Sequence, residues 1–403
     1  MLRNKLQMNL QASKVFRGDQ AIWLIVLLLG IFSMLVVYSS TENLASRQDT
    51  NVEMVLVRHG LFMLIAVGVM IFSHLINYLK YAKLAPLLLA LAIFLLLYTM
   101  AFGVHLNGAA RWIRIPLTPF TIQTSDFAKV ALLLYLARTI SLMQNKAINK
   151  WELYGPVIAI CVLIAPYDLS NALVLFATSI LVMVIGKVDV TDILKVMGIG
   201  LAAFAILIFL SDYITEIRAD TWVSRFKNFV EDSEAEQVML SKMAVARGGL
   251  IGVGPGNGVQ SHFLPHAYSD YIYCIIVEEY GLAGGLFVLF LYVALVYRCI
   301  QMVRKSAKTF GAMLAVALSM GLAFQAFAHI AVNVNLVPAT GLTLPFISLG
   351  GSSLLFTGLS FGIILSVSRG VDKTTLNKKM NTSDSLENQF TNRVDDTPEP
   401  YAS

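Results

Sequence analysis

The stretch at residues 333–355, NVNLVPATGLTLPFISLGGSSLL, constrains the fold of this chain more than any other. It lies between two long apolar runs, yet it contains Pro338, Pro345, the pair Gly350-Gly351 and several serine and asparagine residues. Proline interrupts a helix because its ring fixes φ and removes the backbone N–H, and adjacent glycines permit tight turns. At membrane depth, such backbone survives only where protein or a water-filled cavity satisfies its polar groups. A broken segment between two spans therefore predicts a cavity with a function.

The composition indicates an all-α polytopic membrane protein. Hydrophobic residues make up 57% of the chain and charged residues 14%, whereas a soluble domain has about 25% charged residues. Apolar runs long enough to cross a bilayer recur along the sequence, and we expect about ten transmembrane helices. The fifth and sixth runs are short, and periodicity leaves open whether they are two spans or one broken hairpin. The expected spans are 21–39, 56–77, 84–104, 122–142, 153–167, 169–187, 191–211, 271–297, 309–332 and 352–369.

The distribution of lysine and arginine sets the expected orientation. With the N-terminus inside, most basic residues fall in inside loops, and the short outside loops hold mainly Arg47, Arg58, Arg111 and Arg114. This asymmetry predicts that both termini are cytoplasmic. The net charge of +5 is then explained by the topology and by contact with anionic membrane lipids. No basic stripe with interleaved aromatic residues indicates a nucleic acid partner.

Three parts of the chain follow from this topology. Residues 1–20 form a cytoplasmic N-terminus, and residues 21–370 form the membrane domain, in which one large extracytoplasmic loop spans about 212–270. The tail at 371–403 is too poor in apolar residues to fold alone and is expected to be disordered in the cytoplasm. The first span follows a basic stretch without a small-residue cleavage site, so we expect it to remain as an anchor.

Metal-binding patterns do not occur in the sequence. No CxxC, HExxH or other Cys/His spacing typical of a metal site appears. The three cysteines, Cys161, Cys274 and Cys299, lie in or beside spans and are expected to pack as small apolar residues.

Charged residues gather near the outer face, where each costs free energy and is a functional candidate. Arg111 lies in NGAARWIRI (107–115), and the next span begins with QTSDFAK (123–129). Asp126 and Lys129 are three residues apart, so they share a helix face and can pair. Two interpretations stay open for this cluster. It is either a structural ion pair with interfacial anchors, or a cationic patch for a phosphate-bearing lipid, since arginine binds phosphate oxygens bidentately.

Two further aspartates lie at outer helix boundaries. Asp168, in APYDLSNALV (165–174), is either a helix N-cap or a functional carboxylate. Asp270 stands at the entrance of a span, in the string that runs from the glycine-rich loop GVGPGNG to the pair Glu278-Glu279, and the same two interpretations apply to it. The glycine-rich loop lacks a GK[ST] sequence and a preceding strand, which excludes an ATP-binding loop, although its backbone N–H groups could still bind a phosphate.

These strings together resemble the SEDS family, the FtsW/RodA peptidoglycan polymerases, over residues 20–370. The resemblance rests on TGL-x-LPFIS-x-GGSS, on G-x-ARWI, and on GPGN followed by FLP-x-A, Asp270 and the EE-x-G string. GPGN and FLP-x-A favour the division-type over the elongation-type (RodA-like) members. The chain departs from the usual pattern at four positions, Thr124 for proline, Asp126 for glutamate, Gly258 for serine and Tyr271 for phenylalanine.

The resemblance implies a peptidoglycan glycosyltransferase that polymerises lipid II during cell division. Lipid II, membrane lipids, a class B penicillin-binding transpeptidase and other division proteins are the implied partners. We assign Asp270 as the general base of an inverting transfer and Arg111, Lys129 and Arg225 as cations for the pyrophosphate leaving group. A divalent cation could share that work, but the sequence contains no definite site for one. The remaining residues expected to bind substrate are Asp126, Asp168, Glu279 and Ser352.

Two functions from other classes stay open at this point. A lipid II flippase or transporter would explain the broken segment and the charged groups in the spans, although no internal repeat supports it. A non-catalytic scaffold of the division machinery would explain neither the outward charge cluster nor the glycine-rich loop.

Overall fold

The computed structural model describes residues 17–41, 44, 51–106, 109–114, 121–144, 148–210, 219–231, 236–305 and 309–371. Most of the expected N-terminal part (1–20), nearly all of the expected tail (371–403) and two pieces of the expected loop (212–270) lie outside the described residues.

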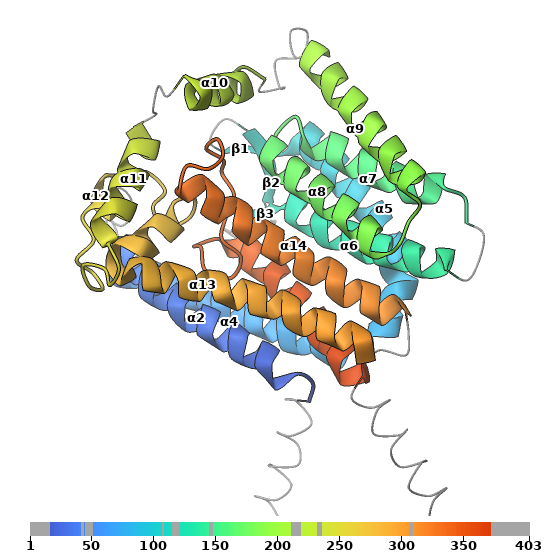
Figure 1. Cartoon of the computed structure of the whole chain (residues 1–403), viewed down its shortest axis with the longest axis horizontal. Coiled ribbons are helices and arrows are strands. Elements are labelled where there is room, and N and C mark those ends of the chain that lie inside the picture. The colour runs from blue at the N-terminus through green and yellow to red at the C-terminus, as the bar shows by residue number, and fades with distance from the viewer. Residues whose placement is uncertain are drawn as a thin grey trace, which may run out of the picture.

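Long apolar helices dominate the described chain (Figure 1). Each of the ten predicted apolar runs coincides with one helix, so the predominantly helical membrane fold is confirmed. Among the described residues, seven helices are long and apolar enough to cross a membrane, namely α2, α4, α5, α9, α13, α14 and the last helix. The apolar helices are α2 (Gln20–Ser40), α4 (Val52–Leu75), α5 (Tyr78–Phe102), α6 (Thr124–Met143), α7 (Trp151–Ile164), α8 (Leu169–Ile185), α9 (Val190–Leu210), α13 (Ile272–Lys305), α14 (Thr309–Asn333) and the last helix (Gly351–Val371).

The short fifth and sixth runs form two separate helices. α7 has 14 residues and α8 has 17, and they pack against each other. Asp168 ends the connection between them, because its Oδ1 accepts the N–H of Asn171 at 3.2 Å and so caps α8. The sequence left this point open, since hydropathy does not distinguish a short span from half of a hairpin.

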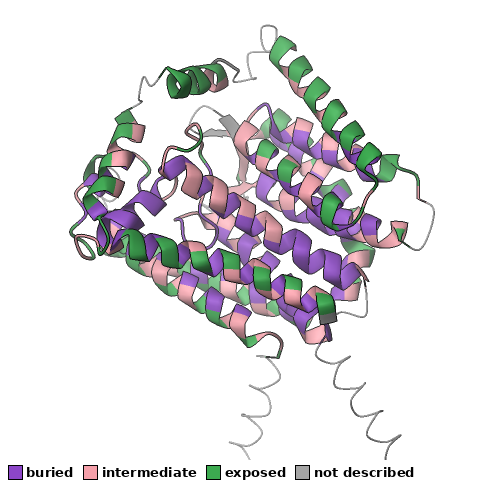
Figure 2. Cartoon of the chain, in the orientation of Figure 1, coloured by how far each residue is buried: buried purple, intermediate pink, exposed green. Residues whose placement is uncertain are grey.

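α14 and the last helix form the centre of the bundle (Figure 2). Their most apolar windows are 78% and 72% buried, whereas the corresponding window of α9 is only 11% buried. Large apolar side chains such as Leu64 and Leu87 point outward from α4 and α5. Outward apolar side chains are expected where acyl chains replace water as the solvent.

A small antiparallel sheet, which was not predicted from the sequence, connects α5 to α6. Its strands are β1 (Val104–Leu106), β2 (Ala109–Arg114) and β3 (Thr121–Gln123), in the order β1-β2-β3. Trp112 of β2 pairs with Gln123 of β3, directly before α6 begins. Strands this short leave almost no alternating pattern in a sequence. The sheet gives Arg111 a fixed backbone position beside α6.

A kink divides α13 at Gly281, whose φ and ψ are 70° and −175°. The helical bonds lost at the kink are replaced by the glycine-rich loop after α11 (Glu236–Gly248). The carbonyls of Glu278 and Glu279 accept the N–H groups of Val253 and Gly254 at 3.0 Å each. In return, the N–H of Leu282 donates to the carbonyl of Gly249 at 2.9 Å. Broken backbone inside the bundle is thus satisfied by protein.

The two described ends of the chain lie together on one face. The backbone N–H of Asp19 donates to Ser368 Oγ at 2.7 Å, and the Asp19 carboxylate pairs with Arg298 at 2.6 Å. The start of α2, the far part of α13 and the end of the last helix therefore meet at the bottom of the bundle in Figure 1. This arrangement agrees with an even number of crossings, and which side faces the cytoplasm stays a prediction.

Candidate functional site

A cavity of about 580 Å³ opens at the other end of the bundle. Its walls come from the beginning of α4, strand β2, the beginning of α8, helix α10 (Ala219–Val230), the loop before α13 and the beginning of the last helix. Five of the eight predicted site residues line this cavity, namely Arg111, Asp168, Arg225, Asp270 and Ser352. The structure therefore brings together residues that lie up to about two hundred and forty positions apart in the chain.

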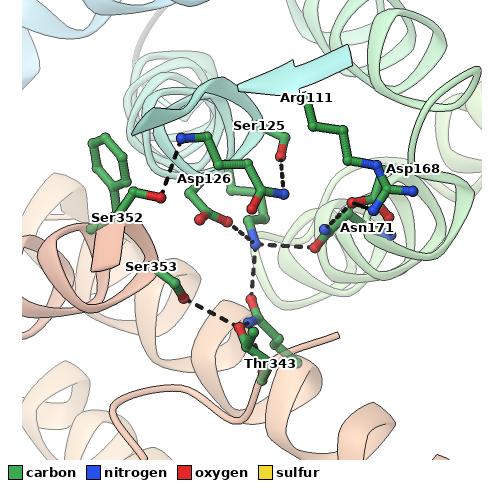
Figure 3. Close-up of polar contacts among 12 residues, drawn as sticks. Arg111, Ser125, Asp126, Asp168, Asn171, Thr343, Ser352 and Ser353 are labelled. Atoms are coloured by element: carbon green, nitrogen blue, oxygen red, sulfur yellow. Dashed lines mark hydrogen bonds and ion pairs between the residues drawn. The ribbon is translucent and has the colours of Figure 1, made fainter. Parts of the chain in front are cut away.

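Arg111 and Asp168 form an ion pair in the cavity wall (Figure 3). Arg111 Nη1 lies 3.2 Å from Asp168 Oδ2, and Arg111 Nε donates to the carbonyl of Tyr167 at 2.7 Å. A guanidinium has five N–H donors, so these contacts leave donors available to a bound anion. Asp168 also caps α8, so this residue is a helix N-cap and also a carboxylate of the cavity wall.

Lys129 lies beneath the cavity and does not line it. Its ammonium group donates to Asp126 Oδ1 at 2.8 Å, to Asn171 Oδ1 at 3.1 Å and to Gln325 Oε1 at 3.0 Å (Figure 3). An ammonium has three donors, so all three are engaged by protein. The predicted pairing of Asp126 with Lys129 is confirmed, but this geometry makes the pair a link between α6, α8 and α14. A narrow crevice of about 40 Å³ borders both side chains, and Ser353 lines both spaces.

Asp270 lies half-buried on the cavity wall, two residues before α13. Burial raises the pKa of the Asp270 carboxyl above its ordinary value of 3.8, and the neighbouring Asp168 acts in the same direction. A hydrogen bond from Ser269 and the positive charges of His266 and Arg111 lower this pKa in part. A carboxylate whose pKa is raised by burial is a stronger base than an exposed one.

Glu279 lies away from this cavity, contrary to its predicted place in the substrate site. Its Oε2 accepts the hydroxyl of Ser39 at 2.8 Å. Its neighbour Glu278 accepts the N–H groups of Val259 and Gln260 at 3.0 and 3.2 Å. These carboxylates are 1% and 0% exposed and hold the glycine-rich loop against α13. The motif that contains them is long, and sequence spacing alone did not separate the residue facing the cavity from those supporting the loop.

Several cavity residues were not identified from the sequence. Arg58 lines the wall formed by α4 and is exposed, and it forms no ion pair or hydrogen bond within the described part of the chain. In the sequence, Arg58 indicates only the orientation of the chain, although its place at the outer boundary of a span is a signal for a functional cation. The other main polar residues of the cavity are His59, Gln123, Gln237, His266, Tyr268 and Thr343.

Ser352 links the last helix to the small sheet. Its Oγ accepts the backbone N–H of Gln123 at 3.2 Å, and Gln123 Nε2 donates to Ser125 Oγ at 3.0 Å (Figure 3). Ser352 therefore lines the cavity and also connects the last helix to strand β3 through a hydrogen bond.

No group of three His, Cys, Asp or Glu side chains that could hold a metal ion occurs among the described residues.

Comparison with known proteins gives one consistent family. The family model for the cell cycle proteins FtsW, RodA and SpoVE matches residues 19–373. The probable peptidoglycan glycosyltransferase FtsW of Geobacter metallireducens is 31% identical over 373 residues, covering 90% of this chain and 98% of the relative. Stage V sporulation protein E of Bacillus subtilis is 30% identical over 361 residues, covering 87% of this chain and 97% of the relative.

Solved structures share the fold. A chain from a study of polymerisation and crosslinking by a peptidoglycan synthase complex aligns with a TM-score of 0.68 and 21% identity, covering 88% of this chain and 99% of that chain. The rod shape determining protein RodA of Thermus thermophilus aligns with a TM-score of 0.63 and 21% identity, covering 88% of this chain and 97% of that chain.

Proposed function

The chain belongs to the FtsW/RodA/SpoVE family of cell cycle proteins, and we propose that it is a peptidoglycan glycosyltransferase that polymerises lipid II during cell division. The main support from the structure is the Asp270 carboxylate on the wall of a cavity that also contains Arg58, Arg111 and Arg225. One base and several cations around one space fit the transfer of a sugar from a pyrophosphate.

The donor sugar of lipid II is α-linked to pyrophosphate, and the product is β-linked, so the displacement inverts. Asp270 takes the proton of the acceptor hydroxyl while the acceptor oxygen bonds to the anomeric carbon. The bond from that carbon to the pyrophosphate oxygen breaks, and the electron pair leaves with the pyrophosphate.

The departing pyrophosphate needs positive charge directed at the developing anion. Arg111 and Arg225 supply it, and Arg58 on the wall formed by α4 adds a third guanidinium. Lys129 does not take this role, since its three donors are already engaged. We assign the cavity to the outer face of the cytoplasmic membrane, because the basic residues concentrate in the loops of the opposite face. A class B penicillin-binding transpeptidase and other division proteins are the proposed partners.

The test uses the purified full chain with lipid II and a cognate transpeptidase, with glycan chains as the readout. The parent is expected to make polymer, and Asp270→Asn is expected to make none while it expresses and unfolds like the parent. Asparagine keeps the shape of the side chain but cannot accept a proton as a base at neutral pH. Polymer made by Asp270→Asn at a rate near the parent's would disprove the assignment of the base. A parent that moves lipid II across vesicles without polymerising it would favour the transporter.

A further inference from the structure

The broken segment between α14 and the last helix contacts the loop that bears Asp270. Three successive carbonyl groups of this loop each accept a hydrogen bond from residues 333–349. The carbonyls of Tyr268, Ser269 and Asp270 accept, in that order, from the N–H of Leu349 at 2.9 Å, the hydroxyl of Ser348 at 2.8 Å and the carboxamide of Asn333 at 3.0 Å. Two of the three donors are side chains, so these hydrogen bonds depend on the identities of Asn333 and Ser348.

Asn333 uses every polar atom of its side chain. Its Nδ2 donates to the carbonyls of Asp270 at 3.0 Å and His329 at 2.9 Å, and its Oδ1 accepts the N–H of Cys274 at 3.0 Å. Cys274 is the third residue of α13, and its N–H is one of the two that an N-cap side chain accepts. Asn333 therefore caps α13 from another helix.

The Ser348 hydroxyl also forms hydrogen bonds both as acceptor and as donor. It accepts the N–H of Leu344 at 2.8 Å and donates to the carbonyl of Ser269. Because a hydroxyl has one proton, this donation fixes its orientation. Ser348 is 3% exposed and Asn333 is 0% exposed, and neither side chain lines the cavity.

The same segment also leaves room beside the carboxylate. A Cβ placed on Gly341 would lie 3.6 Å from Asp270 Oδ2. The segment therefore places Gly341, which has no side chain, next to the Asp270 carboxylate. Its other residues bind the backbone carbonyls of Ser269 and Asp270.

We propose that Asn333 and Ser348 are positioning residues that hold Asp270 in place for proton transfer without touching the substrate. This inference rests on the proposed function, in which Asp270 is the base. A base must lie within hydrogen-bond reach of the proton it takes, and supporting hydrogen bonds keep such a group within about 0.5 Å of the productive position. Loss of either donor lets the loop move, which lowers turnover and leaves substrate binding unchanged.

The experiment compares Ser348→Ala, Asn333→Ala and the control Ser319→Ala in the full chain with its transpeptidase. Ser319 is also a fully buried serine, but its hydroxyl donates to the carbonyl of Val316 in its own helix. The measurements are kcat and KM for lipid II and the unfolding temperature in detergent. Ser348→Ala is expected to lower kcat roughly tenfold and Asn333→Ala roughly a hundredfold, as loss of one or more hydrogen bonds predicts. KM stays within about twofold, and Ser319→Ala matches the parent.

Two results would overturn the inference. One is a kcat for Ser348→Ala within about twofold of the parent. The other is a loss of kcat that comes with a rise in KM of similar fold, or with an unfolding temperature well below that of the parent. Ser348→Ala decides the matter alone if Asn333→Ala does not fold. Asp270→Asn is measured in parallel. If it is inactive while Ser348→Ala is fully active, the positioning role fails and the base assignment stands. If Asp270→Asn is active, the base assignment itself fails.

Discussion

At the scale of single residues, the structure separates charged groups that face the cavity from charged groups that hold helices together. Arg111 lies in the ARWI string and Lys129 follows it on the next span, and both were predicted to act as leaving-group cations. Lys129 is engaged by Asn171, which is 42 positions away, and by Gln325, which is 196 positions away. No local pattern contains contacts at such separations, so only the fold reveals which cation has donors to spare.

The first prediction concerns Arg111, whose planar group suits a bidentate phosphate contact better than the point charge of lysine. Arg111→Lys is expected to lower kcat/KM for lipid II polymerisation by roughly ten- to a hundredfold, the equivalent of about 1.5–3 kcal/mol for a charge-assisted hydrogen bond. Asp168→Asn is the matched comparison, because asparagine keeps an acceptor for the N–H of Asn171 but removes the ion pair with Arg111. Equal losses in both variants would mean that Arg111 acts only through its pair with Asp168.

The second prediction concerns the pH dependence of the reaction. Asp270 must be ionised to act as a base, and burial raises its pKa above the ordinary value of 3.8. The acid side of the kcat/KM profile should therefore fall at a higher pH than an ordinary aspartate would give. The charge of His266 lowers the pKa of Asp270, so His266→Asn should move this acid limb to still higher pH. Asparagine tolerates the φ of 60° at this position. An acid limb that stays unchanged, or that moves to lower pH, would contradict the electrostatic argument.

At the scale of elements, hydropathy predicted where helices form but not how they are interrupted. The span at 271–297 was expected to be one helix, and its kink at Gly281 depends on backbone bonds to a loop about thirty positions earlier. The broken segment at 333–355 was predicted correctly, because proline and glycine act on their own backbone. Its role in holding the Asp270 loop came only from tertiary contacts.

The third prediction tests why the glycine-rich loop contains glycine. A Cβ on Gly252 would lie 2.3 Å from the carbonyl oxygen of Glu279, whereas a Cβ on Gly256 would meet no atom within 4 Å. Both residues have positive φ, 89° and 75°, so alanine at either position costs about 1–2 kcal/mol of backbone strain. Gly252→Ala should cost a further 1–3 kcal/mol or so from overpacking. The measurement is the unfolding temperature in detergent, and equal losses in the two variants would show that close packing against α13 is unimportant.

At the scale of the whole molecule, the helical bundle follows from composition because a bilayer allows few other structures. Ten apolar runs gave ten helices, and the described ends of the chain meet on one face. The central position of α14 and the last helix was not predicted, although these two are the least apolar of the seven long helices among the described residues, because burial depends on how the helices pack. The three-stranded sheet was missed because its longest strand has six residues.

The last prediction concerns orientation, on which the assignment of the cavity to the outer face depends. Lys227 lies on α10 beside the cavity, and Arg304 lies near the far end of α13, and both are exposed. The three native cysteines, Cys161, Cys274 and Cys299, are buried and free, so the parent provides a low background. Lys227→Cys should react with an impermeant thiol reagent on intact cells, with any outer membrane permeabilised. Arg304→Cys should react only after lysis, because the positive-inside pattern places that end of α13 in the cytoplasm. Labelling in the reverse order would place the cavity on the cytoplasmic side and the basic loops on the outer side. Polymerisation at the outer surface would then be excluded.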